Sequence, residues 1–294
     1  MTPYSDPRER LQAWLLVGAL VLSGCVLVLR LGLPTRDAVV LVGANDDGSV
    51  VFVRLSEANT GLVDRQVTTR LALLPAEGVP VEHRAMHAPS GVSLGADGVV
   101  AAPDALTRVT AGAWELRVGG DAAHARLNVT ASAPSTACPP PSGALRGTVQ
   151  YGAEGLLVDG AAGIVHTRVQ GRANDGALWV IARGVWIGVD ANATHCPAWA
   201  LHGGTRWSGP APSLPERIGE AVVVGPYRVT LEAWSPALTL DPLVHVSVPE
   251  RWLGRLAGLQ QSSLRRVRVR VVGPDLPAGG VPRPGILLDR AAAR

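Results

Sequence analysis

Three consecutive segments decide the fold class of this chain: Trp114–Val118 (WELRV), Gly119–Asp121 (GGD) and Ala123–Thr130 (AHARLNVT). Apolar and polar residues alternate in the runs on both sides of the glycine turn. A period of two places the apolar side chains of a run on one face and the polar side chains on the other. The pattern therefore predicts two antiparallel strands of a sheet that is buried on one face and wet on the other.

Similar strand patterns fill most of the chain from residue 38 onward. Ala38–Val42 and Ser49–Leu55, for example, are apolar and β-branched, and Asn45–Gly48 between them is a turn sequence. Helical periodicity is confined to one short candidate near 250–261. We therefore expect an all-β protein, built as barrels or as sandwiches, because both architectures consist of short alternating strands.

The composition excludes several function classes. The chain has 294 residues, of which 47% are hydrophobic and 17% charged, which is too apolar for a mainly disordered protein. Its net charge is only +3 and its basic residues are scattered, so the sequence does not favour a nucleic-acid partner. No phosphate-binding loop, dinucleotide fingerprint or zinc-protease helix occurs. The sequence predicts no catalytic residue, no metal site and no cofactor.

The N-terminal region contains a membrane anchor signal. Leu11–Leu29 is almost unbroken apolar sequence, about the length that crosses a bilayer as a helix. We expect residues 1–37 to form a cytoplasmic tip and a single-pass anchor in a bacterial inner membrane, with the remainder exported to the periplasm or beyond. Leu22–Cys25 resembles the lipobox of bacterial lipoproteins, which would make Cys25 a lipidation site. An uncleaved helix and a lipoprotein both remain open, and either form is membrane-bound.

Two cysteines lie outside the apolar segment. In an oxidising compartment, Cys138 and Cys196 would form one disulfide, which closes a long loop and stabilises the fold by about 4 kcal/mol on a chain-entropy estimate. The alternative is a pair of unpaired thiols.

The clearest break in the sequence is the Pro-rich segment Ser132–Gly143, which contains the triplet Pro139–Pro141. A proline triplet favours a stiff, extended connection and does not fit a central strand. We therefore expect a first β domain over 38–133, a linker over 134–143 and a second β domain over 144–294.

The order of features around this break resembles the tandem lipocalin-like proteins related to carotenoid 1,2-hydratase and AttH. The resemblance extends over about residues 110–235 and implies two lipocalin-like barrels in tandem. An apolar strand ends the first barrel, and a His-containing segment and a Trp-bearing strand belong to the second. The features that carry it are, in chain order, Trp114–Val118, Ala125–Val129, Gly147–Val149, Leu157–His166, Gly171, Ala177–Trp179 and Trp186.

The chain also departs from the pattern of this family. Val165 stands where the family has an acid before the histidine, Gly163 replaces an aromatic residue, and Val169–Gly171 replaces a Trp-Gly pair. Of this segment of the family pattern, only His166 and the glycines are present in this chain. A buried carboxyl can act as a general acid and valine cannot, so we expect hydratase chemistry to be absent. The resemblance then implies a barrel interior that holds one apolar molecule.

The sequence thus predicts a membrane-anchored, exported protein that binds a hydrophobic small molecule or lipid without catalysis. The candidate ligand-binding residues are His166, Trp179 and Trp186, because aromatic side chains supply large apolar area with a polar handle. The alternative is a structural or protein-interaction module of the cell envelope, and an enzyme of the hydratase or isomerase type ranks last. An apolar cavity would favour binding, whereas solid sandwich cores would favour the structural role.

Overall fold

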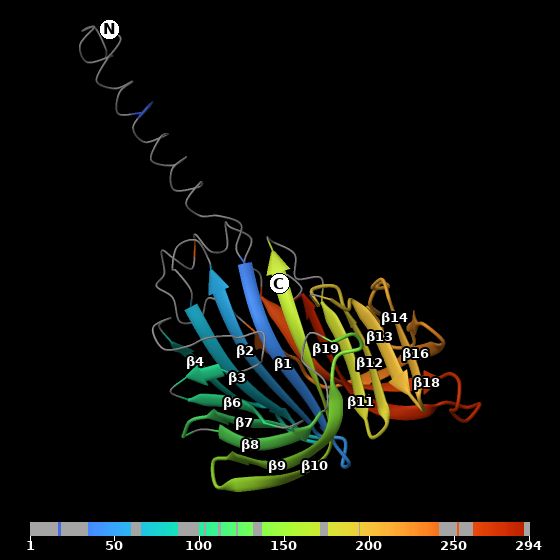
Figure 1. The fold of residues 1–294 in the computed structure, drawn as a ribbon, viewed down its shortest axis with the longest axis horizontal. Coiled ribbons are helices and arrows are strands. Elements are labelled where there is room, and N and C mark those ends of the chain that lie inside the picture. The colour runs from blue at the N-terminus through green and yellow to red at the C-terminus, as the bar shows by residue number, and fades with distance from the viewer. Residues whose placement is uncertain are drawn as a thin grey trace, which may run out of the picture.

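The computed structural model is all-β, as the sequence predicts, and its strands form two curled sheets (Figure 1). Besides residues 17, 18 and 252, it describes residues 35–59, 66–87, 100–102, 104–110, 113–121, 123–131, 137–170, 176–193, 195–240 and 261–290.

Two predicted elements fall almost entirely outside the described residues. These are the apolar segment 11–29, with Cys25, and the short helix near 250–261. Within the described part of the chain, no helix is long and apolar enough to span a membrane.

The first sheet is a ten-stranded antiparallel meander. Its chain-neighbouring strands pair in turn, and β1 and β10 pair with each other, so that the two edges are β4 and β5. In sheet order the strands are β4 (Val81–His87), β3 (Gln66–Leu74), β2 (Val50–Asn59), β1 (Thr35–Asn45), β10 (Glu154–Gln170), β9 (Ser142–Tyr151), β8 (Ala123–Thr130), β7 (Ala113–Gly119), β6 (Ala105–Thr110) and β5 (Val100–Ala102).

The second sheet has nine strands and is also antiparallel. Its sheet order begins with four strands, β14 (Thr205–Gly209), β13 (Ala198–His202), β12 (Val185–Asp190) and β11 (Ala177–Ala182). It continues through β19 (Val281–Arg290), β18 (Ser262–Val272), β16 (Tyr227–Trp234) and β15 (Ala221–Val224), and β17 (Leu238–Leu240) pairs with β18 beside this path.

The predicted alternation is confirmed at β7 and β8. The residues of β8 are buried and exposed in strict alternation. Trp114 lies opposite Val129, and Leu116 lies opposite Leu127, so the apolar side chains of both strands share the inner face. In β7 and β8 one face of the sheet is therefore buried and the other is exposed to solvent.

The strands at the centre of the molecule are buried on both faces. Leu41 of β1 packs in the core inside the first sheet, whereas its neighbours Val40 and Val42 pack in a second core between the two sheets. A third core, which includes Val180 and Ile187, fills the inside of the second sheet. Figure 1 shows β1 and β10 in the middle of the molecule, beside β11 and β19.

The Pro-rich segment does not separate the two sheets. The strands on either side of it, β8 and β9, pair with each other, and β9 then pairs with β10 in the same sheet. The chain passes from the first sheet to the second only between Gln170 and Ala177. The change of sheet therefore comes later than the boundary that the sequence led us to expect at 134–143.

Two tryptophan rings in the layer between the sheets lie over glycines of neighbouring strands. A Cβ atom added to Gly163 of β10 would lie 2.4 Å from the Trp186 ring, and one added to Gly188 of β12 would lie 2.1 Å from the Trp199 ring. The two rings also contact each other, with centroids 5.2 Å apart. The packing of the Trp186 ring against β10 therefore depends on the missing side chain at 163.

We predict that Gly163→Ala destabilises the protein by about 1–3 kcal/mol, because the added methyl group forces the Trp186 ring to move in a packed core. Gly155→Ala on the same strand is the matched control, since its nearest atom would be Gln150 Cγ at 3.8 Å. Urea unfolding of both variants measures the difference. Equal stabilities of the two variants would contradict the packing of the Trp186 ring against Gly163.

Candidate functional site

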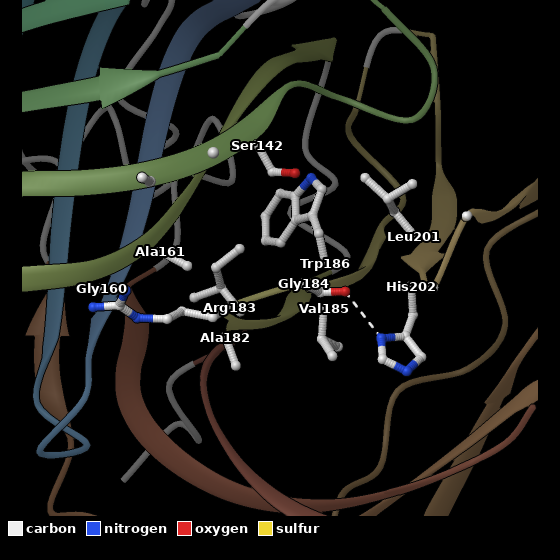
Figure 2. A pocket seen from close by; sticks show the side chains of 15 residues that line it. Ser142, Gly160, Ala161, Ala182, Arg183, Gly184, Val185, Trp186, Leu201 and His202 are labelled. Atoms are coloured by element: carbon white, nitrogen blue, oxygen red, sulfur yellow. Dashed lines mark hydrogen bonds between the residues drawn. The ribbon is translucent and has the colours of Figure 1, made fainter. Parts of the chain in front are cut away.

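A half-open cavity of about 480 Å³ lies between the two sheets (Figure 2). One wall comes from β9 and β10 of the first sheet, and the other from β11, β12, β13 and their turns. The lining residues are Ser142, Gly143, Ala144, Gly160, Ala161, Ile181, Ala182, Arg183, Gly184, Val185, Trp186, Leu201, His202, Gly203 and Gly204.

Most of the cavity lining is apolar or glycine. Trp186 and Leu201 are cross-strand neighbours on the face of the second sheet that meets the first sheet, and Ala161 faces them from β10. Ile181 pairs with Trp186 from the other side. The cavity is therefore an opening at the end of the apolar layer that joins the sheets.

The rim of the cavity is fixed by a small ionic network. The Arg183 guanidinium lies 3.0 Å from the carboxylate of Asp46 in the turn after β1 and 3.0 Å from that of Asp159 in β10. The hydrogen bond and charge of Asp46, with the charge of Asp159, raise the pKa of Arg183. These pairs are exposed, so each contributes little to stability. They hold the Arg183 side chain across the boundary between the sheets.

His202 has a fixed tautomer at the other side of the rim. Its Nδ1 atom lies 2.9 Å from the carbonyl oxygen of Gly184 (Figure 2). A carbonyl only accepts, so Nδ1 carries the hydrogen and, in the neutral ring, Nε2 carries the lone pair. The ring also contacts Tyr227 edge-on.

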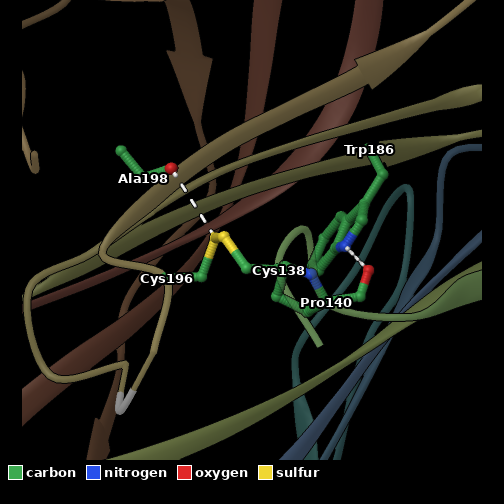
Figure 3. Close-up of a disulfide and its surroundings, with 5 residues drawn as sticks. All are labelled: Cys138, Pro140, Trp186, Cys196 and Ala198. Atoms are coloured by element: carbon green, nitrogen blue, oxygen red, sulfur yellow. Dashed lines mark hydrogen bonds between the residues drawn. A yellow bond between two sulfur atoms is a disulfide. The ribbon is translucent and has the colours of Figure 1, made fainter. Parts of the chain in front are cut away.

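The predicted disulfide is confirmed, and it lies beside the cavity wall (Figure 3). Cys138 precedes β9, whereas Cys196 lies between β12 and β13, so the bond joins the two sheets. Close by, Trp186 Nε1–H donates a hydrogen bond of 3.1 Å to the carbonyl oxygen of Pro140. The chain that leads from Cys138 to the cavity residue Ser142 is thus attached to the second sheet at two points.

The structure separates the three predicted ligand-binding residues. Trp186 lines the cavity, and Trp179 is fully buried in the same layer, where it packs near Phe52 rather than at the cavity. His166 lies on the opposite face of β10, because it alternates with Val165, and its Nε2 is 2.7 Å from the Asp37 carboxylate. His166 therefore does not share the cavity of Trp186.

A polar cluster that the sequence analysis missed lies across the edges of the first sheet. Asp104, just before β6, accepts hydrogen bonds from Thr69 of β3 and from the Nε2 atoms of His83 and His87 of β4. Burial raises the pKa of the Asp104 carboxyl, but the hydrogen bonds from Thr69 and His83 and the interaction with His87 outweigh burial and lower it. The sequence signal was the even spacing of His83 and His87, which places both on one face of a strand.

Asp190, at the end of β12, is a second buried carboxyl that the sequence analysis missed. Burial raises its pKa to about 7, although a backbone hydrogen bond from Asn192 and the charge of Arg54 oppose the shift. Asp190 shares the strand face of Trp186, so it belongs to the layer between the sheets. The sequence around Asp190 does not predict that its side chain is buried, because the residues that follow it form a turn.

The described residues contain no group of three or more His, Cys, Asp or Glu side chains placed to hold a metal ion. Among the residues that line the cavity, the ionisable side chains are Arg183 and His202. Arg183 is held by two carboxylates, and His202 uses one ring nitrogen on the backbone. The arrangement is suited to bind an apolar body beside a polar rim.

The comparisons with known proteins identify the fold. No family model and no curated protein matches the sequence. Among solved structures, a candidate AttH from Nitrosomonas europaea matches with a TM-score of 0.53 and 14% identity, over 87% of this chain and 92% of that chain. CghA in complex with Sch210972 matches with a TM-score of 0.48 and 11% identity, over 88% of each chain. The match to the candidate AttH supports the expected likeness at the level of the fold alone.

We predict that Asp104→Asn lowers the free energy of unfolding at neutral pH, because the carboxylate is the common acceptor of the cluster. A native pKa below the ordinary value of 3.8 gives stability that is present above that pH and is lost as the pH falls through the native pKa. Chemical unfolding of both proteins between pH 2 and pH 7 should show their difference shrink toward acid. A difference that is constant with pH would exclude this role of the charge.

We predict the opposite pH dependence for Asp190. Its native pKa of about 7 lies above the ordinary 3.8, so the folded protein keeps a proton that the unfolded chain releases. Wild-type stability should therefore fall by about 1 kcal/mol per pH unit between roughly pH 5 and 7 from this group. Asp190→Asn, which keeps an acceptor for Asn192 N–H, should remove that slope in urea titrations. An unchanged slope would refute the assignment.

Proposed function

We propose that this protein binds a hydrophobic small molecule or lipid, without catalysis, in the cavity between its two sheets. The observation that carries the proposal is the apolar cavity of about 480 Å³ beside Trp186. Ligand pockets have volumes of this order and combine apolar walls with a few fixed polar groups. The location differs from the barrel interior that the sequence suggested, because side-chain cores occupy the inside of both sheets.

The walls of the cavity support binding because they are held in place before a ligand arrives. The Trp186 ring is fixed by its bond to Pro140 and by its contact with Trp199. Arg183 is tied to Asp46 and Asp159 at the rim. Because the walls of a preformed site are already ordered, the free energy of binding is not reduced by the entropic cost of ordering them. An apolar molecule with one polar end at the rim fits this distribution.

The proposal includes a membrane-bound, exported location, with the apolar segment 11–29 as the anchor. The disulfide supports export, since such bonds persist in oxidising compartments. A lipid or another apolar solute near the membrane would then be the natural ligand class.

A structural role in the cell envelope is the second candidate. The observation that favours it is the dense filling of both sheet interiors, which is what a scaffold needs. The two candidate functions predict different behaviour of the cavity. A binding protein should bind an apolar ligand there saturably, whereas a structural protein should not.

The test uses the full chain and a diazirine-bearing long-chain alcohol as a photolabel, followed by peptide mass spectrometry. We expect saturable labelling of peptides from 142–151 and 177–186, which unlabelled alcohol suppresses. Ala144→Trp should abolish this labelling by filling the cavity, since residue 144 is exposed and lines it. Labelling of residues 11–29 by membrane-dissolved probe serves as an internal standard.

Thr148→Trp is the matched control, because residue 148 is exposed on the same face of β9 but does not line the cavity. It should label as the wild type does. Labelling that does not saturate, or that survives Ala144→Trp unchanged, would refute binding in the cavity and favour the structural role.

A further inference from the structure

The disulfide is placed to control the cavity wall. Cys138 is followed by three prolines and then by Ser142, the first residue of the cavity. The carbonyl of Pro140 accepts from Trp186 of the second sheet, and that of Pro141 accepts from Ile164 N–H of the first sheet at 2.9 Å. The segment 138–141 is thus wedged between the sheets, and the disulfide is its covalent attachment to the second sheet.

The two cysteine residues differ in exposure. Cys138 is exposed, whereas Cys196 is 2% exposed. The Cys196 Sγ atom lies 3.8 Å from the carbonyl oxygen of Ala198 (Figure 3). In the disulfide this sulfur has no hydrogen, so the approach is a contact only. In the reduced form the thiol would donate to Ala198 O, and its burial would leave no donor unsatisfied.

From this geometry we infer that the Cys138–Cys196 bond is a redox-controlled clasp, whose reduction by a dithiol loosens the cavity wall and weakens ligand binding. The inference rests on the proposed function, since it assigns a regulation to the same cavity. Cys138, as the exposed residue of the pair, is the side from which a reductant would attack, and the carbonyl of Ala198 would accept from the Cys196 thiol in the opened state.

Reduction opens the clasp by thiol–disulfide exchange. A thiolate of the dithiol attacks the Sγ atom of the exposed residue Cys138, the S–S bond breaks, and the Cys196 thiolate leaves and takes up a proton. The second thiol of the reagent then attacks the mixed disulfide and releases Cys138 as a thiol. The protein gains two electrons and two protons, and the reagent leaves as its own disulfide. Reoxidation closes the clasp again.

Reduction loosens the wall without removing its other contacts. The bonds of Pro140 and Pro141 remain, so the segment samples attached and detached positions instead of unfolding outright. If the binding-competent arrangement falls to about a tenth of the population, the apparent Kd rises about tenfold. The sheets keep their own cores, which the disulfide does not touch.

The experiment measures photolabelling of the cavity peptides by the diazirine alcohol in the oxidised full chain and after dithiothreitol. We expect the concentration for half-saturation to rise about tenfold on reduction and to recover on reoxidation. Hydrogen exchange should accelerate in 137–145 and stay unchanged in 113–131. The Cys138→Ser, Cys196→Ser double variant should behave like the reduced protein and ignore dithiothreitol.

The outcomes separate the two proposals. If the oxidised protein shows no saturable cavity labelling, the proposed function fails and the clasp fails with it. If the oxidised protein binds and the reduced protein binds equally, with two free thiols confirmed by mass, the clasp alone is overturned. If reduction and the double variant both accelerate exchange throughout the sheets, the disulfide is a general requirement of folding, and the clasp is likewise overturned.

Discussion

The burial of β1 and of residues 160–165 of β10 on both faces is the constraint on which the rest of the structure depends. One face of each strand closes the core of the first sheet, and the other face meets the second sheet. Neither sheet is complete without this layer, because Trp179, Trp186 and Trp199 would otherwise expose their rings to water. At about 25 cal/mol per Å² of apolar surface removed from water, the layer outweighs the exposed ion pairs at its rim.

The cavity follows from the same constraint. The layer is filled where large side chains of the second sheet meet small ones of the first, as Trp186 does at Gly163. Near the start of β9 and the middle of β10 the paired residues Ala144 and Ala161 are small, and the two sheets no longer fill the space between them. An opening at the end of an apolar layer is lined by the apolar side chains of that layer, and the charges at its rim come from the turn residues Asp46 and Arg183 and from Asp159 of β10.

Periodicity in the sequence predicted the strands better than it predicted the sheets. The alternation of Ala123–Thr130 correctly indicated a half-buried strand, whereas the continuous apolar run of Ala38–Val42 marks a strand with two buried faces. The Pro-rich segment looked like a domain boundary because proline interrupts strands, yet backbone pairing of β8 with β9 spans it. Of the site, Trp186 and the disulfide were predictable. The Asp104 cluster was not, because it joins strands that are distant in sequence.

The departures from the hydratase-like pattern are related to one another through the faces of β10. Positions 163 and 165, where the family has an aromatic residue and an acid, both face the layer between the sheets, and His166 faces away from it. At 163 the missing side chain admits the Trp186 ring, and at 165 a valine packs in the layer. A carboxylate at 165 would be buried beside tryptophan rings, at a high desolvation cost. The two replacements together make this face of the strand closely packed, because a ring fills the space at 163 and an apolar side chain stands at 165 where a carboxyl would have to be buried.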